Sequence, residues 1–192
     1  MRKINPNWLT ALRMPLGMMC MGFLCMNSTA GLTLCLVAMA FAVWTDWEDG
    51  RVARATGQVS DFGKIFDPLC DSVYLTFIWL GFLHLNWISI WLVVIFPVRD
   101  QVVAYMRVYM SHEGVIMAAR WSGKIKLTVQ VSVQMAVVLL RLIVPASEAL
   151  DIVQLCLILI AVGVTLYSLY DYFQGFRQTV SVGSFFKTRA AA

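Results

Sequence analysis

Six long apolar stretches, separated by short polar segments, dominate the sequence. A helix needs about 20 residues to cross the hydrocarbon core of a bilayer. The pattern therefore predicts an all-α, polytopic membrane protein with six transmembrane helices, forming a single domain over residues 1–192. The predicted helices are Trp8–Met26, Gly31–Trp44 with a helical continuation to about Ala55, Phe66–Leu83, Trp87–Tyr109, Ile125–Val144 and Ala149–Phe173.

The composition agrees with a membrane protein. The chain is 60% hydrophobic and only 14% charged, whereas soluble domains carry about 25% charged residues. The formal net charge of +4 comes from Lys and Arg in short segments that flank the apolar stretches. The positive-inside rule accounts for such placement, and no nucleic-acid-binding signature accompanies it. No nucleic-acid partner is therefore expected.

Lys and Arg fall in alternate polar segments. They precede the first stretch and follow the second, fourth and sixth, whereas the turns Asn27–Ala30 and His84–Asn86 contain neither. The last turn has only Arg141 nearby, against Glu148 and Asp151. Because cytoplasmic loops carry the excess of Lys and Arg, we expect a multi-pass protein of the cytoplasmic membrane with both termini in the cytosol.

Four aspartates flank the basic loop between the second and third stretches. Asp46 and Asp49 are three residues apart, and Asp67 and Asp71 are four apart, so each pair shares one face of a helix. Two consecutive membrane helices run antiparallel, and both pairs lie toward the cytosolic side. The four carboxylates are therefore expected to converge in a site that faces the cytosol.

Carboxylates so close together repel one another, and a pair of divalent cations would remove the repulsion. Ligands that are all oxygen favour Mg²⁺ or Mn²⁺ over zinc, and two such ions can grip a diphosphate. Gly50 would let a ligand approach closely, and Arg54 is placed to pair with phosphate oxygens. The alternative, open for each aspartate alone, is a solvated, charged helix end.

These residues resemble a known signature. Asp46-x-x-Asp49-Gly50-x-x-Ala53-Arg54, followed after eight residues by Gly63-x-x-x-Asp67-x-x-x-Asp71, is similar to the complete motif of the CDP-alcohol phosphotransferases. The resemblance implies a six-helix membrane fold, a homodimer, two bound metal ions and Asp71 as the general base toward the acceptor hydroxyl. It implies metal ligation by Asp46, Asp49, Asp67 and Asp71, and CDP binding by Gly50, Arg54 and Gly63.

Three further segments resemble the bacterial phosphatidylglycerophosphate synthases within that family. They are Asn5 to Arg13, the pair Arg99-Asp100 with Arg107, and Gly123-Lys124-Ile125-Lys126 with Gln130. This resemblance implies CDP-diacylglycerol and sn-glycerol 3-phosphate as substrates. The chain departs from the subfamily pattern at Cys70, Ser72, Asp100 and Leu127, which bears on the acceptor and not on the type of reaction.

Four cations are candidates for binding the acceptor phosphate. Arg99 and Arg107 are eight residues apart, nearly on one helix face, and Lys124 and Lys126 begin the next helix. Such groups suit a phosphate. Lys124 and Lys126 also fit ordinary positive-inside charge, and Arg99 could instead serve a structural pairing with Asp100.

Two other functions remain open at this point. Phosphatidylinositol phosphate synthases also use a phosphorylated acceptor and a basic pocket, so a different acceptor alcohol is the nearest rival. A cation or proton transporter belongs to another class. Transporters usually place ionisable groups near the bilayer midplane in broken helices, whereas the aspartates here are predicted at one face.

Overall fold

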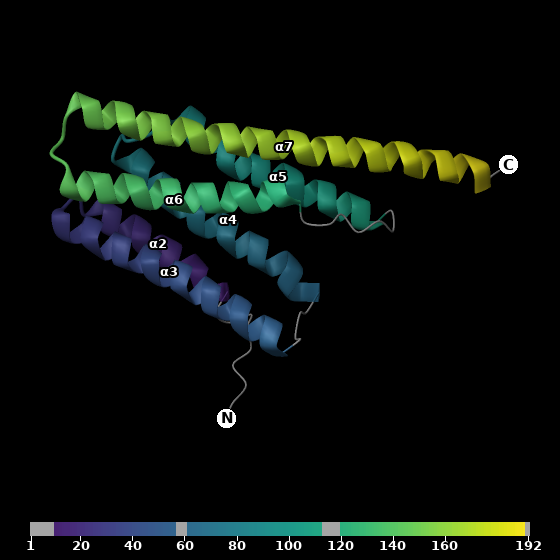
Figure 1. The fold of residues 1–192 in the computed structure, drawn as a ribbon, viewed down its shortest axis with the longest axis horizontal. Helices are drawn as coiled ribbons and strands as arrows, with labels where there is room; N and C mark the ends of the chain where they lie inside the picture. Colours follow the sequence, from purple (N-terminus) through teal and green to yellow (C-terminus); the bar gives the residue numbers. More distant parts are fainter. Residues whose placement is uncertain (1–9, 57–60, 113–119, 191–192) are drawn as a thin grey trace.

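The structure is a computed structural model that describes residues 10–56, 61–112 and 120–190, with only the backbone described for 47–56, 61–65 and 179–190. Every regular element in these ranges is a helix, which confirms the all-α prediction (Figure 1). The helices are α2 (Arg13–Cys25), α3 (Thr29–Thr56), α4 (Asp61–His84), α5 (Ile90–His112), α6 (Trp121–Ile143) and α7 (Glu148–Ala190).

Four of the described helices contain a segment long and apolar enough to cross a membrane, so the chain is a polytopic membrane protein. The segments are Thr29–Asp46, Phe66–His84, Trp121–Ile143 and Glu148–Gln178. In α5, the charged residues Arg99, Asp100 and Arg107 interrupt the apolar run, and α2 has 13 residues. The total of six spans stays a prediction.

Asparagine and serine residues explain the turns at several helix ends. Asn27 and Asn86 adopt positive φ angles of 44° and 58°, a conformation that asparagine tolerates better than most residues after a helix. The hydroxyls of Ser28 and Ser147 accept hydrogen bonds from backbone N–H groups in the first turns of α3 and α7, at 3.1 and 3.3 Å. These caps satisfy donors that a helix start leaves unpaired.

Two helices are longer than the apolar pattern predicts. Helix α7 continues to Ala190, well beyond Phe173, and α4 begins at Asp61 rather than Phe66. Pro68 therefore lies inside α4, where its ring removes one backbone hydrogen bond. Both extensions mix charged and polar residues with apolar ones, so hydrophobicity alone does not mark them as helical.

The helices pack as a bundle in which α2 lies along α3 and α4, while α6 lies along α7 (Figure 1). The crossing of α2 and α4 is very close at Gly17, where an added Cβ would lie 2.8 Å from Cα of Tyr74. Nearby in the core, the rings of Trp79 and Phe96 stack with centroids 4.4 Å apart and join α4 to α5. The close crossing fixes the register between α2 and α4.

The signature aspartates and Arg13 gather toward one end of the bundle. The turns after α2, α4 and α6 gather at one end, while the C-terminal end of α3 and the N-terminal end of α4 lie toward the other (Figure 1). Arg13 begins α2 at this second end. The aspartates of the signature are carried by α3 and α4, so α2 brings a cation to the same region.

Candidate functional site

Arg13 joins two aspartates of the signature. Its Nη2 donates to Oδ1 of Asp46 on α3, and its Nη1 donates to Oδ1 of Asp71 on α4. The Arg13 side chain is 7% exposed, while those of Asp46 and Asp71 are 59% and 20% exposed. Asp46 and Asp71 therefore lie close enough for one cation to contact both of them. The sequence predicts that these two aspartates converge.

The remaining signature residues are placed less completely. Asp67 lies one turn before Asp71 on α4, with an exposed side chain. Asp49 lies one turn after Asp46 on α3, but its side chain falls outside the described part of the structure. The same is true of the side chains of Arg54 and of the residues next to Gly50 and Gly63. Among the described side chains, no three of His, Cys, Asp or Glu form a metal-holding group.

The donor set of Asp46 and Asp71 fits a hard divalent cation. Both provide only carboxylate oxygens, which Mg²⁺, Mn²⁺ and similar ions prefer. Each carboxylate uses Oδ1 toward Arg13 and keeps Oδ2 outside these two hydrogen bonds. The pair that meets at Arg13 is therefore chemically suitable for a metal, whereas Asp67, whose side chain is also described, forms no metal-holding group with it.

Asp100 on α5 organises a second, basic cluster. Its two oxygens accept from Nζ of Lys126 at 2.7 and 2.8 Å, and Oδ1 also accepts from Arg99 at 3.0 Å. Arg99 and Lys126 are buried, with 6% and 4% exposure. The structural pairing of Arg99 with Asp100, which the sequence left open, is present, and it also includes Lys126.

Tyr172 on α7 holds the other side of this cluster. The guanidinium carbons of Arg99 and Arg107 each lie 5.2 Å from the centre of its ring, within the range of cation–π attraction. Its hydroxyl accepts from Arg107 at 2.6 Å and from the backbone N–H of Arg120 at 3.1 Å. Arg99 also donates to the hydroxyl of Ser168.

The predicted acceptor cations are only partly brought together. Arg99, Arg107 and Lys126 share Asp100 or Tyr172 as partners, as described above. Lys124 instead places its ammonium 5.4 Å from the ring centre of the exposed Trp121, and no contact in the described residues joins it to the other three. Its predicted role in phosphate binding stays a prediction.

The acid pair and the basic cluster are neighbours. Ser72, the residue after Asp71 on α4, donates a hydrogen bond of 2.7 Å to Oδ2 of Asp100. Consecutive residues of one helix thus contact the two clusters. A substrate with one phosphate near Asp71 and another phosphate near Lys126 would lie across this junction.

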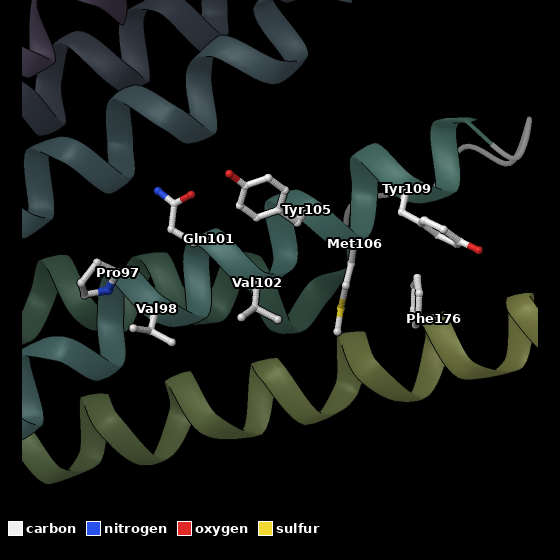
Figure 2. A pocket seen from close by; sticks show the side chains of 8 residues that line it. All are labelled: Pro97, Val98, Gln101, Val102, Tyr105, Met106, Tyr109 and Phe176. Carbon is white, nitrogen blue, oxygen red and sulfur yellow. The ribbon is translucent and has the colours of Figure 1, made fainter.

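An apolar groove lies apart from these clusters, on the side of α5 that faces α7. Figure 2 shows Met106 of α5 and Phe176 of α7 approaching each other there, with Pro97, Val98 and Val102 further along α5. Its volume is about 610 Å³. None of the charged residues described above lines it, so the groove is no place for a phosphate.

Residues 3–167 match the family model described as CDP-alcohol phosphatidyltransferase. The chain belongs to the CDP-alcohol phosphatidyltransferase family. The match covers the acid pair, the cluster residues of α5 and α6, and five of the six described helices. On α7 it ends just before Ser168 and Tyr172. Enzymes of this family generally depend on a divalent metal, in agreement with the suitability of Asp46 and Asp71.

Several relatives within the family resemble this chain over much of its length. The chain is 30% identical over 146 residues to CDP-diacylglycerol–glycerol-3-phosphate 3-phosphatidyltransferase of Mycoplasma genitalium, covering 67% of this chain and 62% of that protein. It is 31% identical over 102 residues to the Bacillus subtilis protein of the same name, covering 53% and 51%. A probable phosphatidylglycerophosphate synthase of Mycobacterium tuberculosis is 30% identical over 149 residues, covering 74% and 68%. The alignment thus spans less than two thirds of the first two relatives.

Sequence reasoning missed several members of this site. Arg13 gave a usable signal, because a charge within an apolar stretch is expensive and usually has a purpose. In the sequence, Ser72 stands out only as a departure from the subfamily pattern. Ser168 and Tyr172 carry no motif, and their place in the cluster depends on how α7 packs against α5 and α6.

Proposed function

We propose that this protein transfers the phosphatidyl group of CDP-diacylglycerol to sn-glycerol 3-phosphate, giving phosphatidylglycerophosphate and CMP. The observation that carries the proposal is the junction at Asp71 and Ser72, where signature acids meet a buried basic cluster. The name of the Mycoplasma genitalium and Bacillus subtilis relatives supports the same substrates.

The basic cluster suits a phosphorylated acceptor. Arg99, Arg107 and Lys126 contribute three positive charges, and Asp100 contributes one negative charge, so two positive charges remain. A phosphate monoester carries up to two negative charges near neutral pH. Arginine also offers paired donors that match phosphate oxygens. Lys124 is proposed as a further contact at the mouth of the cluster.

In the proposed reaction, Asp71 takes the proton from the acceptor hydroxyl. The hydroxyl oxygen then bonds to the β-phosphorus of CDP-diacylglycerol, and the bond from that phosphorus to the CMP oxygen breaks. Arg54, Gly50 and Gly63 are proposed to hold the CDP group. A pair of Mg²⁺ or Mn²⁺ ions, bound by Asp46, Asp49, Asp67 and Asp71, would neutralise the diphosphate.

The proposed setting is the cytoplasmic membrane, with both termini and the site facing the cytosol and the protein acting as a homodimer. The alternation of basic and neutral loops supports this orientation. The dimer rests on the resemblance to the family. The apolar helix surfaces leave the lipid chains of the donor in contact with the bilayer while its headgroup reaches Asp71.

The test is an assay of CMP release by the purified protein in detergent with Mg²⁺ or Mn²⁺. Release is expected only when CDP-diacylglycerol and an acceptor are both present, and Asp71→Asn is expected to abolish it. Asp151→Asn, an exposed aspartate on α7 that pairs with Arg141, serves as the matched control. Full activity of Asp71→Asn would refute the role of Asp71 as the base.

The acceptor is tested separately with a panel of alcohols. Glycerol 3-phosphate is expected to support release far better than inositol 1-phosphate, free inositol or serine. Preference for inositol 1-phosphate would assign the protein to the rival synthase. Cation flux in liposomes without any lipid substrate would favour a transporter instead.

A further inference from the structure

Arg13 occupies a position that the proposed reaction leaves unexplained. It is the first residue of α2, outside the signature, and it is 6% exposed. A buried guanidinium is strongly unfavourable unless it is paired. Its partners are two of the four acids proposed to bind metal, Asp46 and Asp71.

Within the described residues, these two carboxylates are the acceptors that hold the guanidinium. The Nε atom of Arg13 is buried and makes no hydrogen bond there. Both terminal nitrogens are committed, one to each aspartate. The planar fork of arginine, with donors on separate nitrogens, allows one side chain to bridge acids from two helices.

The position of Arg13 is enforced by helix packing. Gly17, one turn further along α2, lies against the backbone of Tyr74, one turn beyond Asp71 on α4. Because the two helices touch at that point, Arg13 is carried to the level of Asp71. The contact is therefore a consequence of the α2–α4 crossing and not of a flexible surface side chain.

We propose that Arg13 is an internal counter-cation that competes with the metal for Asp46 and Asp71. While no metal is bound, Arg13 offsets one of the two negative charges of Asp46 and Asp71 and holds α3 and α4 together. Metal binding then has to draw the carboxylates away from Arg13 and against its positive charge. This inference rests on the proposed function, since it requires that Asp46 and Asp71 bind metal.

The competition predicts opposite effects on two measurable quantities. Removal of the Arg13 charge leaves the carboxylates repelling one another, so the metal-free protein loses stability. The same change leaves more negative charge for the metal, so its affinity rises. A purely structural tether would lower stability with and without metal alike, and a residue that positions the ligands would weaken metal binding when removed.

The experiment measures Mn²⁺ binding by titration and thermal unfolding in detergent, with chelator or with saturating Mn²⁺. Arg13→Gln is expected to bind Mn²⁺ about fivefold or more tightly than wild type, the lower range of typical coupling between linked sites. Its unfolding temperature should fall in chelator and recover with Mn²⁺, so that the gap between the two conditions widens. An unchanged or weaker Kd for Mn²⁺ would overturn the proposal.

Arg141→Gln is the matched control, because Arg141 also pairs with an aspartate, Asp151, far from the candidate site. It should leave the Kd for Mn²⁺ unchanged. If Arg13→Gln does not fold, Arg13→Met replaces it. Methionine keeps an unbranched side chain but carries no charge, so tighter Mn²⁺ binding is still expected, and a Kd equal to or weaker than that of wild type overturns the proposal.

A separate experiment shows whether a negative result contradicts the proposed metal site or only the role of Arg13. Wild-type protein is expected to bind Mn²⁺, and Asp46→Asn and Asp71→Asn are expected to weaken that binding. If wild type binds no Mn²⁺, or if both aspartate variants bind as wild type does, the proposed metal site is wrong. If the aspartates matter but Arg13→Gln does not tighten binding, only the role of Arg13 is wrong.

Discussion

Ser72 donates a 2.7 Å hydrogen bond to Asp100 and so connects the acid pair to the basic cluster. The bond runs from α4 to α5, and Ser72 follows Asp71 directly in the chain. Since Asp100 also accepts from Arg99 and Lys126, the serine helps to fix the carboxylate on which both cations depend. The proposed base and the proposed acceptor site are thereby held in a defined relation.

Ser72→Ala should loosen the contact between α4 and α5 while the protein still folds. The loss of one neutral-to-charged hydrogen bond is worth about 1.5–3 kcal/mol at most, and Asp100 keeps its two cations. We expect a several-fold rise in the KM for glycerol 3-phosphate with a smaller change in kcat, measured by CMP release. Ser132→Ala on the exposed side of α6 is the control, and an equal effect of the two variants would contradict the prediction.

Asp100→Asn should be among the most damaging substitutions in this region. It removes the only carboxylate that contacts Arg99 and Lys126 among the described residues, and both cations are buried. Breaking a buried pair by removing one partner costs about 3–5 kcal/mol. We therefore expect a large fall in the free energy of unfolding in detergent.

Two comparisons make the Asp100 prediction specific. Asp100→Glu keeps the charge and is expected to retain most of the stability. Asp151→Asn removes an aspartate that is 63% exposed, and exposed pairs contribute about 0–1 kcal/mol. Equal losses for Asp100→Asn and Asp151→Asn would show that the cluster contributes nothing to stability.

Gly17→Ala should push α2 away from α4. The added methyl would lie 2.8 Å from Cα and 3.0 Å from the carbonyl oxygen of Tyr74, and backbone atoms cannot move aside as a side chain can. Overpacking of this kind typically costs about 1–3 kcal/mol, which exceeds the helix-propensity gain of about 1 kcal/mol from glycine to alanine. We expect a lower unfolding temperature and weaker contact of Arg13 with Asp71.

Gly22 provides the matched control for Gly17. It lies on the same helix, and nothing is within 4 Å of a Cβ added there. Gly22→Ala should therefore be neutral or slightly stabilising. If both glycine variants change the unfolding temperature equally, the close crossing of α2 and α4 does not set the register.

The order of the helices and the convergence of two aspartates could be predicted from the sequence. Long apolar stretches mark membrane helices whatever their neighbours are, and helical spacing together with antiparallel succession places Asp46 near Asp71. The partner of those acids could not be predicted in this way. That Arg13 reaches both depends on the depth and rotation of α2, which the Gly17 crossing sets.

Lys124 and Lys126 show a second limit. The sequence predicts that both contact the acceptor phosphate, but residues two apart lie about 200° apart around a helix. When Lys126 faces Asp100, Lys124 must point away, and it lies over Trp121. Helical geometry therefore places the two ammonium groups on different faces of α6, and which of them faces Asp100 depends on how α6 packs.

Tyr172→Phe should weaken acceptor binding while the fold stays intact. The substitution removes the hydroxyl that accepts from Arg107 at 2.6 Å, but the ring stays beneath Arg99 and Arg107. A hydrogen bond to a charged group contributes about 1.5–3 kcal/mol, so the KM for glycerol 3-phosphate should rise roughly tenfold or more with little change in kcat. Tyr172→Leu removes the ring as well and should raise the KM further. Tyr167→Phe, on the same helix and 65% exposed, should match wild type. A wild-type KM in Tyr172→Phe would mean that Arg107 needs no anchor to bind the acceptor, and that the aromatic ring alone positions the two guanidiniums.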